Sequence, residues 1–273
     1  MEFTAHNILL NDGTRTLGAN EPLLSEGEQC KAILRTLNEH FPEKDRSAVR
    51  VVDLGCLEGG YTVEFARAGY QALGVEAREM NVAKCQHVAE QLNLPNLTFV
   101  QDDVKNLADH GSFDVVFCCG LLYHLDRPQE FLRLVGTLTN RMLILHTHYA
   151  REHDPLYDNK LYQLKSKVQR KIANTSSDRV DYGLSRLDVH EGNQGRWLYE
   201  YSDEDERAFV EKELWRSYSN TRSFWPCKRD LLQIIRTSGF ALVYEQYDFL
   251  DDIKHNDYIE RHDRSLFVGL KPS

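Results

Sequence analysis

Short apolar runs alternate with segments of helical periodicity through the middle of the chain. The runs at 50–54, 71–76, 97–101, 113–118 and 141–147 are rich in β-branched and aromatic residues and predict strands. Longer amphipathic segments lie between them and predict helices. Strands that alternate with helices are typical of βαβ units, in which the strands run parallel. The pattern therefore predicts an α/β fold around a parallel sheet.

The two ends of the chain predict additions to this sheet. Within residues 1–48, Ser25 and Glu28 have capping-box spacing ahead of apolar residues at helical intervals, so we expect a helical lead-in before the first strand. Near the other end, a helix should begin near Pro226 and close at Gly239. The apolar runs at 241–247 and 265–270 then predict a terminal antiparallel hairpin.

The stretch 149–224 is too long to be an ordinary connection between a strand and a helix. It contains charged and aromatic residues but no long apolar run, so we expect it to pack on the sheet rather than fold alone. We interpret it as an inserted substrate cap. The whole chain, 1–273, is then a single elaborated domain.

Composition narrows the possible partners. The chain has 273 residues, a hydrophobic share of 41% and a formal net charge of −9, which suit a globular protein without a large phosphate-binding face. The segment Lys160–Lys171 carries five positive charges and no acidic residue. We interpret it as a solvated helix face, with a local nucleic-acid contact as the alternative.

The cysteines and the first residues of the chain indicate where in the cell the protein is expected. Six cysteines are scattered without a CxxC pair or zinc-finger spacing, so we expect neither a disulfide framework nor a structural zinc site. The first residues lack a basic segment followed by an apolar one, and no apolar run approaches the roughly 20 residues that span a bilayer. We expect a cytoplasmic protein that does not insert into membranes.

A glycine-rich loop, Asp53–Gly60, joins the first strand to a helix. Glycine has no Cβ, so a ligand can approach the main chain of such a loop closely. Glu76 ends the next strand, where a carboxylate can accept hydrogen bonds from both hydroxyls of a ribose. Asp103 follows the third strand and can accept a hydrogen bond from an adenine amino group. Together these positions predict a clamp for adenosine.

With these motifs in this order, the sequence resembles the class I methyltransferases that use S-adenosylmethionine, from about Val51 to Thr147 and again at the terminal hairpin. The resemblance implies a Rossmann-like, seven-stranded methyltransferase sheet. It also implies S-adenosylmethionine as cofactor. One departure is Leu57, which stands where the common family loop has a glycine. The residues that we assign to the cofactor on this basis are Asp53, Gly55, Cys56, Gly59, Glu76, Ala77, Asp103, Val104, Cys119 and Gly120.

A dinucleotide-binding dehydrogenase is the main competing interpretation of the fold. Such an enzyme normally has a tighter glycine fingerprint, which receives a pyrophosphate at the start of the helix. In this chain Glu58 lies within the loop, and a carboxylate fixed there would repel pyrophosphate. S-adenosylmethionine carries no phosphate, and its methionine end includes an amino group. The loop therefore favours methyl transfer.

The segment after the fourth strand carries candidate chemistry. Gly120-Leu121-Leu122-Tyr123-His124 resembles the Gly-x-Leu-Tyr-His segment of one branch of these enzymes, which includes the tRNA wobble-uridine carboxymethyltransferases. The resemblance extends to Ser223–Pro226. We expect Tyr123 and His124 to begin a helix over the cofactor pocket, where a phenol can orient an acceptor and an imidazole can remove its proton. Packing and capping roles are the alternative.

Strand alternation puts His146 and His148 on one face at the carboxyl edge of the sheet. Ligands bind at that edge in such folds. His148 is a candidate general base. The pair could instead hold a divalent metal with a carboxylate from the insertion. Two histidines alone do not define such a site, so no metal is predicted.

The insertion supplies aromatic and polar residues that can line an acceptor pocket or fix the insertion onto the sheet. Arg196 and Arg222 could bind a carboxylate or phosphate on the acceptor, because a guanidinium donates paired hydrogen bonds. The residues that we predict for substrate binding are His146, Tyr149, Arg196, Trp197, Tyr199, Asn220, Arg222 and Trp225.

We therefore predict a methyltransferase that acts on an oxygen or nitrogen of a small metabolite, sugar or natural-product intermediate. Its predicted catalytic residues are His148, His124 and Tyr123. One alternative is a tRNA-modifying methyl- or carboxymethyltransferase, with Lys160–Lys171 touching phosphates. Another is a regulatory subunit that binds the cofactor without catalysis. Neither the acceptor nor the oligomeric state follows from the sequence.

Overall fold

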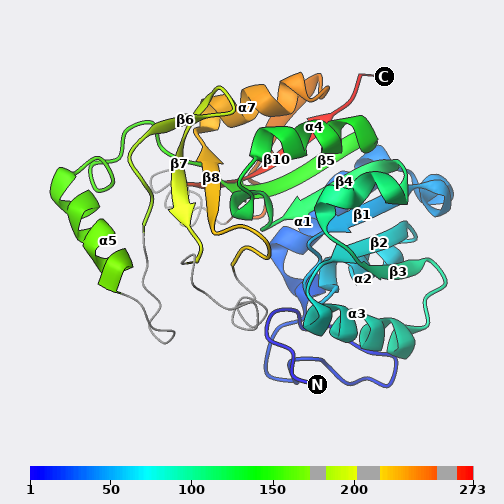
Figure 1. Ribbon diagram of the computed structural model, residues 1–273. Coiled ribbons are helices and arrows are strands. Elements are labelled where there is room, and N and C mark those ends of the chain that lie inside the picture. The colour runs from blue at the N-terminus through cyan, green and yellow to red at the C-terminus, as the bar shows by residue number, and fades with distance from the viewer. Residues whose placement is uncertain (173–182, 202–215, 251–262, 273) are drawn as a thin grey trace.

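A computed structural model describes residues 1–172, 183–201, 216–250 and 263–272. Its centre is a seven-stranded sheet in the order β3-β2-β1-β4-β5-β10-β9 (Figure 1). The strands are β1 Arg50–Leu54, β2 Gln71–Glu76, β3 Leu97–Gln101, β4 Phe113–Cys119, β5 Thr139–His148, β9 Leu242–Gln246 and β10 Arg264–Leu270.

The sheet is mixed, and its topology confirms the predicted fold. Strands β1 to β5 pair in parallel, whereas β10 runs antiparallel between β5 and β9. Each strand predicted from the apolar pattern is present, with ends that differ by two residues at most. The terminal hairpin is confirmed as well. The sheet is thus the Rossmann-like, seven-stranded arrangement implied by the methyltransferase resemblance.

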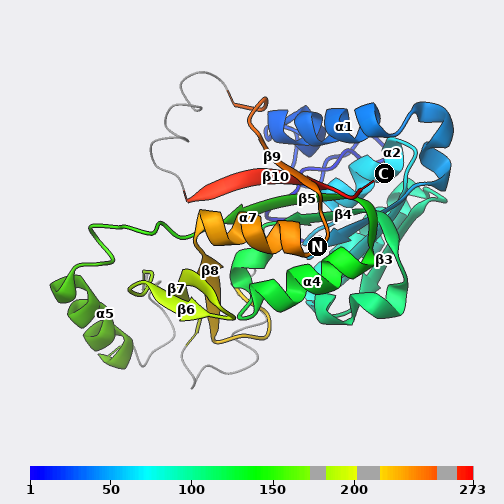
Figure 2. The same ribbon diagram turned by 90° about the horizontal axis from the view of Figure 1, so that it is seen from above.

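Helices cover both faces of the sheet, with α1 and α2 on one side and α4 and α7 on the other (Figure 2). Two apolar clusters correspond to these faces, and neighbouring strand residues alternate between them, as Val51 and Val52 do in β1. The helices are α1 Glu28–His40, α2 Gly60–Arg67, α3 Glu79–Leu92, α4 Pro128–Leu138, α5 Lys160–Ile172 and α7 Lys228–Thr237, with short turns η1 Leu24–Glu26, η2 Glu43–Ala48, η3 Val104–His110 and η4 Leu122–His124.

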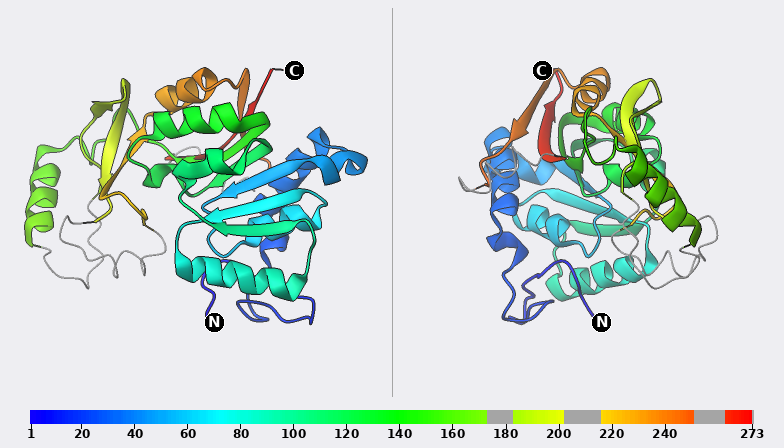
Figure 3. Two further views of the ribbon diagram at one scale, coloured as in Figure 1. Left: turned by 45° about the vertical axis from the view of Figure 1, so that its right-hand side comes forward. Right: turned by 90° about the vertical axis from the view of Figure 1, so that its left-hand side faces the viewer.

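The insertion carries a second sheet that the apolar pattern did not predict. Strands β6 Asp188–His190, β7 Asn193–Tyr199 and β8 Arg222–Pro226 pair antiparallel. Figure 3 shows this small sheet and α5 beyond the end of the main sheet. Strand β8 contacts η4 and α4, so the insertion is joined to the main sheet at its carboxyl edge.

Two predicted helix starts differ from the structure. The helix expected near Pro226 begins at Lys228, because Pro226 is the last residue of β8 and pairs with Gly195. The capping box expected between Ser25 and Glu28 does not form, because Glu28 already lies inside α1 behind Gly27. The Glu26 carboxylate instead accepts a hydrogen bond from the Leu23 N–H at 2.9 Å.

The basic segment 160–171 lies on α5, as expected for a helix face. The Lys160 and Lys165 side chains are exposed there, and so are Leu161 and Leu164. Among the helices that the structure describes, none combines the length and the apolar character needed to cross a bilayer.

Candidate active site

A cavity of about 280 Å³ opens at the carboxyl ends of β1, β2 and β4. Its wall includes strand-to-helix turns of the main sheet, the turn η4 and residues 216–219 of the insertion. Gly59 alone among the predicted cofactor residues is absent from its wall. The predicted residues that line the cavity are Asp53, Gly55, Cys56, Glu76, Ala77, Asp103, Val104, Cys119 and Gly120.

The glycine-rich loop takes left-handed backbone conformations at three positions. Gly55, Leu57 and Gly59 have φ angles of 67°, 55° and 80°. Gly59 is required for a local reason, since a Cβ there would lie 2.6 Å from the Phe99 ring. Leu57 adopts the conformation that glycine prefers, at a cost of about 1–2 kcal/mol. The loop therefore has a glycine-like turn at Leu57 without the glycine.

Side chains already engage the N–H groups of this loop. The Leu57 N–H donates to Glu76 Oε2 at 3.0 Å, and the Gly60 N–H donates to His6 Nδ1 at 3.0 Å. A pyrophosphate at a helix start needs such N–H groups as its donors. Two N–H groups of this loop already donate to protein acceptors, which disfavours a phosphate ligand.

Three carboxyl groups face the cavity. Burial raises the pKa of Asp53 to about 7, although the Thr62 hydroxyl donates to it at 2.7 Å. Burial also raises the pKa of Glu76, although the N–H groups of Leu57 and Arg78 donate to its carboxylate. Asp103 uses Oδ1 to cap η3. Buried carboxylates of raised pKa favour a ligand that brings donors or positive charge.

Glu58 does not face the cavity. Our prediction that its carboxylate would repel a pyrophosphate bound at the loop is therefore wrong. Its side chain is fully buried and accepts hydrogen bonds from the N–H groups of Thr4, Ala5 and His6. The Lys84 ammonium lies 2.7 Å away. Burial alone would raise the pKa of Glu58, but these donors hold it below its ordinary value. Glu58 fastens the N-terminal segment to the loop.

The N-terminal segment thereby reaches the cavity, which the sequence patterns did not predict. His6 lines the wall and meets the Tyr61 ring edge-on, with ring centroids 5.9 Å apart. Burial lowers the pKa of His6 to about 4, so the ring is neutral and its Nδ1 can accept from Gly60. No local periodicity or motif marks this contact, because it joins residues far apart in the chain.

Tyr123 and His124 both line the cavity, but on a single turn, η4, rather than at the start of a helix. The following helix, α4, begins at Pro128. His124 Nδ1 lies 2.8 Å from Oε1 of Glu200, a buried residue that follows β7. Glu200 was not among the predicted site residues. Its position depends on the small sheet, which the sequence did not reveal.

His148 lies behind Tyr123 and outside the cavity wall. Its ring stacks on Trp225 at 4.7 Å and meets the Tyr123 ring edge-on at 4.7 Å. Its Nδ1 is 3.0 Å from the carbonyl oxygen of Asp263. Trp225 in turn donates its indole N–H to the Tyr123 carbonyl at 2.8 Å. The predicted base His148 and the predicted binding residue Trp225 therefore pack against Tyr123 outside the cavity wall.

His146 is buried, with its Nδ1 3.2 Å from the Gln29 amide and 3.6 Å from the Cys119 thiol. Burial first, and the positive charge of Arg264 second, lower the pKa of His146 to about 3. Within the described ranges, no group of three or more His, Cys, Asp and Glu side chains is arranged to hold a metal ion.

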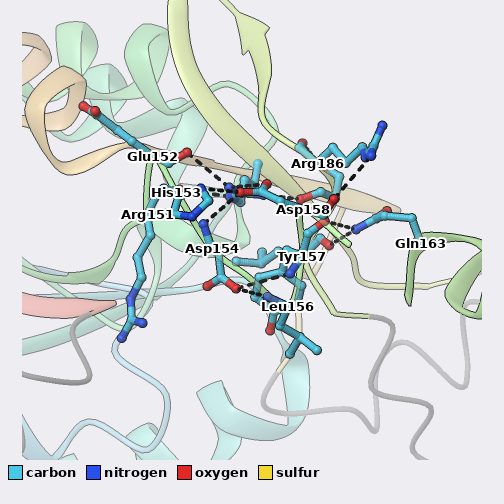
Figure 4. Close-up of polar contacts among 12 residues, drawn as sticks. Arg151, Glu152, His153, Asp154, Leu156, Tyr157, Asp158, Gln163 and Arg186 are labelled. Atoms are coloured by element: carbon cyan, nitrogen blue, oxygen red, sulfur yellow. Dashed lines mark hydrogen bonds and ion pairs between the residues drawn. The ribbon is translucent and has the colours of Figure 1, made fainter. Parts of the chain in front are cut away.

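Arg196 was predicted to bind an acceptor anion, and the structure corrects this. The side chain is fully buried and donates to the main-chain carbonyls of Arg151 and Ser185. Its guanidinium also pairs with the Asp158 carboxylate at 2.8 Å. Figure 4 shows the loop that includes Arg151 and Asp158, together with its polar contacts. Arg196 thus organises the insertion and does not reach the cavity.

The other predicted binding residues also lie outside the cavity wall. Trp197, Tyr199 and Arg222 line a shallow surface pocket on the insertion, where the Arg222 guanidinium lies 4.3 Å from the Trp197 ring. Asn220 donates its amide to the His124 carbonyl at 3.0 Å. Tyr149 packs against Phe267 with ring centroids 6.2 Å apart.

Arg264 is a further residue that the sequence patterns did not single out. It is the first residue of β10, pairs with His148 across the sheet and lines the cavity. Its guanidinium carbon lies 5.7 Å from the Tyr123 ring centroid. Its Nε is buried and has no hydrogen-bond partner among the described residues. Arg264 gives the inner wall of the cavity a positive charge.

Comparison with solved structures places this fold among methyltransferases. The N-terminal domain of EvdMO1, crystallised in the presence of SAH and D-fucose, has a TM-score of 0.63 at 22% identity, covering 97% of this chain and 90% of that one. Magnesium protoporphyrin IX methyltransferase from Synechocystis PCC 6803 with bound SAH has a TM-score of 0.52 at 16% identity, covering 91% and 84%. These likenesses concern the fold.

Sequence comparison gives the family. A ubiquinone biosynthesis O-methyltransferase from Rickettsia felis is 26% identical over 117 residues, 42% of this chain and 47% of that protein. One from Albidiferax ferrireducens is 34% identical over 91 residues, 33% and 36%. The chain thus matches less than half the length of these curated relatives. The family model described as a methyltransferase domain matches residues 45–206, more than half of this chain. The chain belongs to this methyltransferase domain family.

Proposed function

We propose that the protein is a methyltransferase that uses S-adenosylmethionine and acts on an oxygen or nitrogen of a small molecule. The observation that carries this proposal is the cavity at the ends of β1, β2 and β4. It combines the buried carboxylates Asp53 and Glu76 with a loop whose N–H groups are already engaged. At these carboxylates and this loop, a ligand with hydroxyls and positive charge fits better than one with phosphates.

The residues present fit each part of this cofactor. Glu76 retains acceptor capacity for ribose hydroxyls beyond its two main-chain donors. Asp103 keeps Oδ2 for an adenine amino group, and the apolar side chains of Val104 and Leu121 offer surfaces for the base. A methionine amino group beside Asp53 would bring a positive charge, which would lower the raised pKa of this carboxyl group.

When bound, the sulfonium supplies an activated methyl group, and its transfer requires the acceptor atom, the methyl carbon and the sulfur to be nearly collinear. The protein contributes positioning, exclusion of water and removal of a proton. Tyr123 and His124 line the same cavity as the glycine-rich loop. We assign the orienting role to Tyr123 and the base role to His124. His148 supports Tyr123, because it lies behind that ring.

The acceptor class rests on two supports. The curated relatives quoted above are named as O-methyltransferases of ubiquinone biosynthesis, and the solved neighbour was crystallised with D-fucose. The aromatic wall of Tyr123 with Tyr61 suits a ring, whether a phenol or a sugar. A hydroxyl on such a ring is the acceptor that we favour.

The test is transfer of an isotopically labelled methyl group from S-adenosylmethionine into fractionated cell extract. We expect label in the small-molecule fraction, including added catechols or deoxysugars. Label in tRNA instead would support the branch with the Gly-x-Leu-Tyr-His segment. Cofactor binding without label in either fraction would support a regulatory subunit and contradict the proposal.

A further inference from the structure

Glu200 lies at the end of β7 and brings a negative charge into the buried rear of η4. Only 3% of the residue is exposed. Its Oε1 accepts from His124 Nδ1 and from the Ser223 hydroxyl, each at 2.8 Å. Its Oε2 accepts from the Ser217 N–H at 3.3 Å. Burial alone would raise the pKa of Glu200, but His124 and these donors hold it below its ordinary value.

These contacts determine where the imidazole proton resides. An ionised carboxylate can accept a hydrogen bond but cannot donate one. A neutral His124 therefore carries its proton on Nδ1 and keeps the lone pair on Nε2. In the part of the chain that the structure describes, no hydrogen bond occupies Nε2, while the ring itself forms part of the cavity wall. The lone pair is thus free to accept a proton from a bound acceptor.

We propose that Glu200 is the positioning residue of the catalytic base, holding His124 as the Nδ1–H tautomer and stabilising the imidazolium that forms during transfer. This rests on the proposed function. The same logic explains why a buried carboxylate accompanies the catalytic histidine in serine proteases. Two serines on different segments, Ser217 and Ser223, orient Glu200, so the base is organised by the insertion.

The acceptor O–H bond breaks, and its proton moves to His124 Nε2. The acceptor oxygen forms a bond to the methyl carbon, while the bond between that carbon and the sulfonium sulfur breaks and the sulfur keeps the electron pair. The positive charge lost at sulfur thus appears on His124, 2.8 Å from the Glu200 carboxylate. That attraction is screened little by water, because Glu200 is buried and the His124 side chain is only 14% exposed.

Aromatic and charged side chains surround the pair. Tyr123 lies beside His124 with ring centroids 4.4 Å apart, and Arg264 lies beyond Tyr123. Arg216 donates to the Glu200 carbonyl oxygen at 2.6 Å. Glu200 is therefore the negative charge in direct contact with the imidazole, and its replacement should change His124 more than any other substitution in this cluster.

The substitution Glu200→Gln is diagnostic because it removes the negative charge and keeps the shape of the side chain. If its carbonyl oxygen faces the Ser217 N–H, the amide NH2 faces His124 Nδ1, which becomes the acceptor, and the ring proton moves to Nε2. If the oxygen instead keeps the hydrogen bonds from His124 and the Ser223 hydroxyl, Nδ1 still carries the proton but donates it to a neutral acceptor. Both orientations weaken the base, because Nε2 loses its lone pair in the first and the imidazolium loses its counter-charge in the second.

The first test is nitrogen NMR of the whole chain with labelled histidine, using His124→Gln to assign the signal. We expect the Nδ1–H tautomer in the natural protein and, in Glu200→Gln, either the Nε2–H tautomer or an Nδ1–H whose signal shifts because its acceptor is neutral. An Nε2–H tautomer in the natural protein, or no change in the variant, would overturn the proposal. This readout needs no acceptor, so it remains informative even if the proposed activity fails.

The second test is kinetic, once an acceptor is known. We expect Glu200→Gln to lower kcat about 100- to 10,000-fold while the KM for the cofactor stays unchanged. Glu200→Asp keeps a carboxylate and should restore part of kcat. A matched control is Glu191→Gln, because Glu191 accepts from the N–H groups of Gln129 and Glu130 at the start of α4. That control should lose stability without changing the His124 signal. Equal kinetic losses in both variants would indicate a merely structural role.

Discussion

The two sides of the cavity are built in different ways. On the cofactor side, Asp53 and Glu76 stand at the carboxyl ends of β1 and β2, and Asp103 lies in the turn after β3. On the acceptor side, His124 depends on Glu200, which lies 76 positions further along the chain. The first side is made by the parallel sheet itself. The second is made by side chains that a small additional sheet brings to the edge.

This difference suggests that the two sides can be disrupted separately. Replacements on the cofactor side should act on cofactor affinity, because the backbone there belongs to the central sheet. Replacements in the insertion should act on turnover or on local stability, because polar contacts such as that of the buried Arg196 with Asp158 hold the insertion together.

The largest effect should follow removal of the base. We expect His124→Ala to lower turnover about 1,000-fold, since a positioned general base typically contributes two to four orders of magnitude. Cofactor affinity should change less than twofold. His148→Ala is the comparison, and its loss should stay below about tenfold because it acts through Tyr123. Steady-state kinetics measures the turnover of both variants, and calorimetry measures their cofactor affinity. A larger loss of turnover in His148→Ala than in His124→Ala would assign the base role to His148.

Arg196→Ala should destabilise the insertion by about 1–3 kcal/mol, because a fully buried side chain is removed and the three carbonyls and one carboxylate that accept from it lose their donor. Denaturant unfolding measures this. Cofactor affinity should remain within twofold. Arg229→Ala is the control, since the Arg229 side chain is 67% exposed and should contribute little. Loss of cofactor binding in Arg196→Ala would show that the two sides are not separable.

Glu76→Gln should weaken cofactor affinity about 30- to 100-fold, because a hydrogen bond to a buried carboxylate is stronger than one to an amide. The change keeps the volume of the side chain. Glu79→Gln, on the exposed start of α3, is the control. Isothermal titration with S-adenosylhomocysteine measures both. Unchanged cofactor affinity in Glu76→Gln would show that Glu76 does not bind the ribose.

Acid should weaken the protein partly through His146. Its pKa is near 3 in the folded state, against an ordinary value of 6.5, so the unfolded chain binds the proton more readily. The stabilising contribution is present above pH 6.5 and is lost as the pH falls toward 3. Between pH 6.5 and 5 we expect His146 to account for roughly 1.5 kcal/mol of lost stability.

His146→Gln should therefore flatten the stability profile over that interval. His153→Gln should leave the profile unchanged, because the His153 side chain is 83% exposed. Urea unfolding at several pH values distinguishes the two variants. An unchanged slope in His146→Gln would mean that His146 titrates at its ordinary pKa.

Leu57 should give the smallest effect. Glycine relieves the left-handed strain but loses entropy on folding, so Leu57→Gly should change the free energy of unfolding by less than about 1 kcal/mol. Cofactor binding should persist. Leu57→Val, with a branched side chain at the same φ, should destabilise by about 1–3 kcal/mol. Equal stability of the two variants would contradict the backbone argument.

The central sheet was predictable because its signals are local. The apolar runs of β1, β2 and β3 coincide with the predicted segments, and the residue after each strand falls at one sheet edge by topology alone. The predicted cofactor residues share the cavity for this reason. Leu57 was the visible departure, and the backbone accommodates it by a left-handed turn.

The acceptor side was less predictable because it rests on contacts between distant segments. Arg196 has the residue type of an anion binder, but burial engages it with carbonyl groups. Glu58 looked like a cavity residue, yet its donors come from residues 4–6. Glu200 carries no motif at all. Periodicity and spacing do not report such pairings.

The most direct test of the central claim is calorimetric titration of the whole chain with S-adenosylmethionine and, separately, with NAD. The occupied N–H groups of the loop and the buried carboxylates at Asp53 and Glu76 predict saturable binding of S-adenosylmethionine at one site and no binding of NAD. Tight binding of NAD without binding of S-adenosylmethionine would contradict the account.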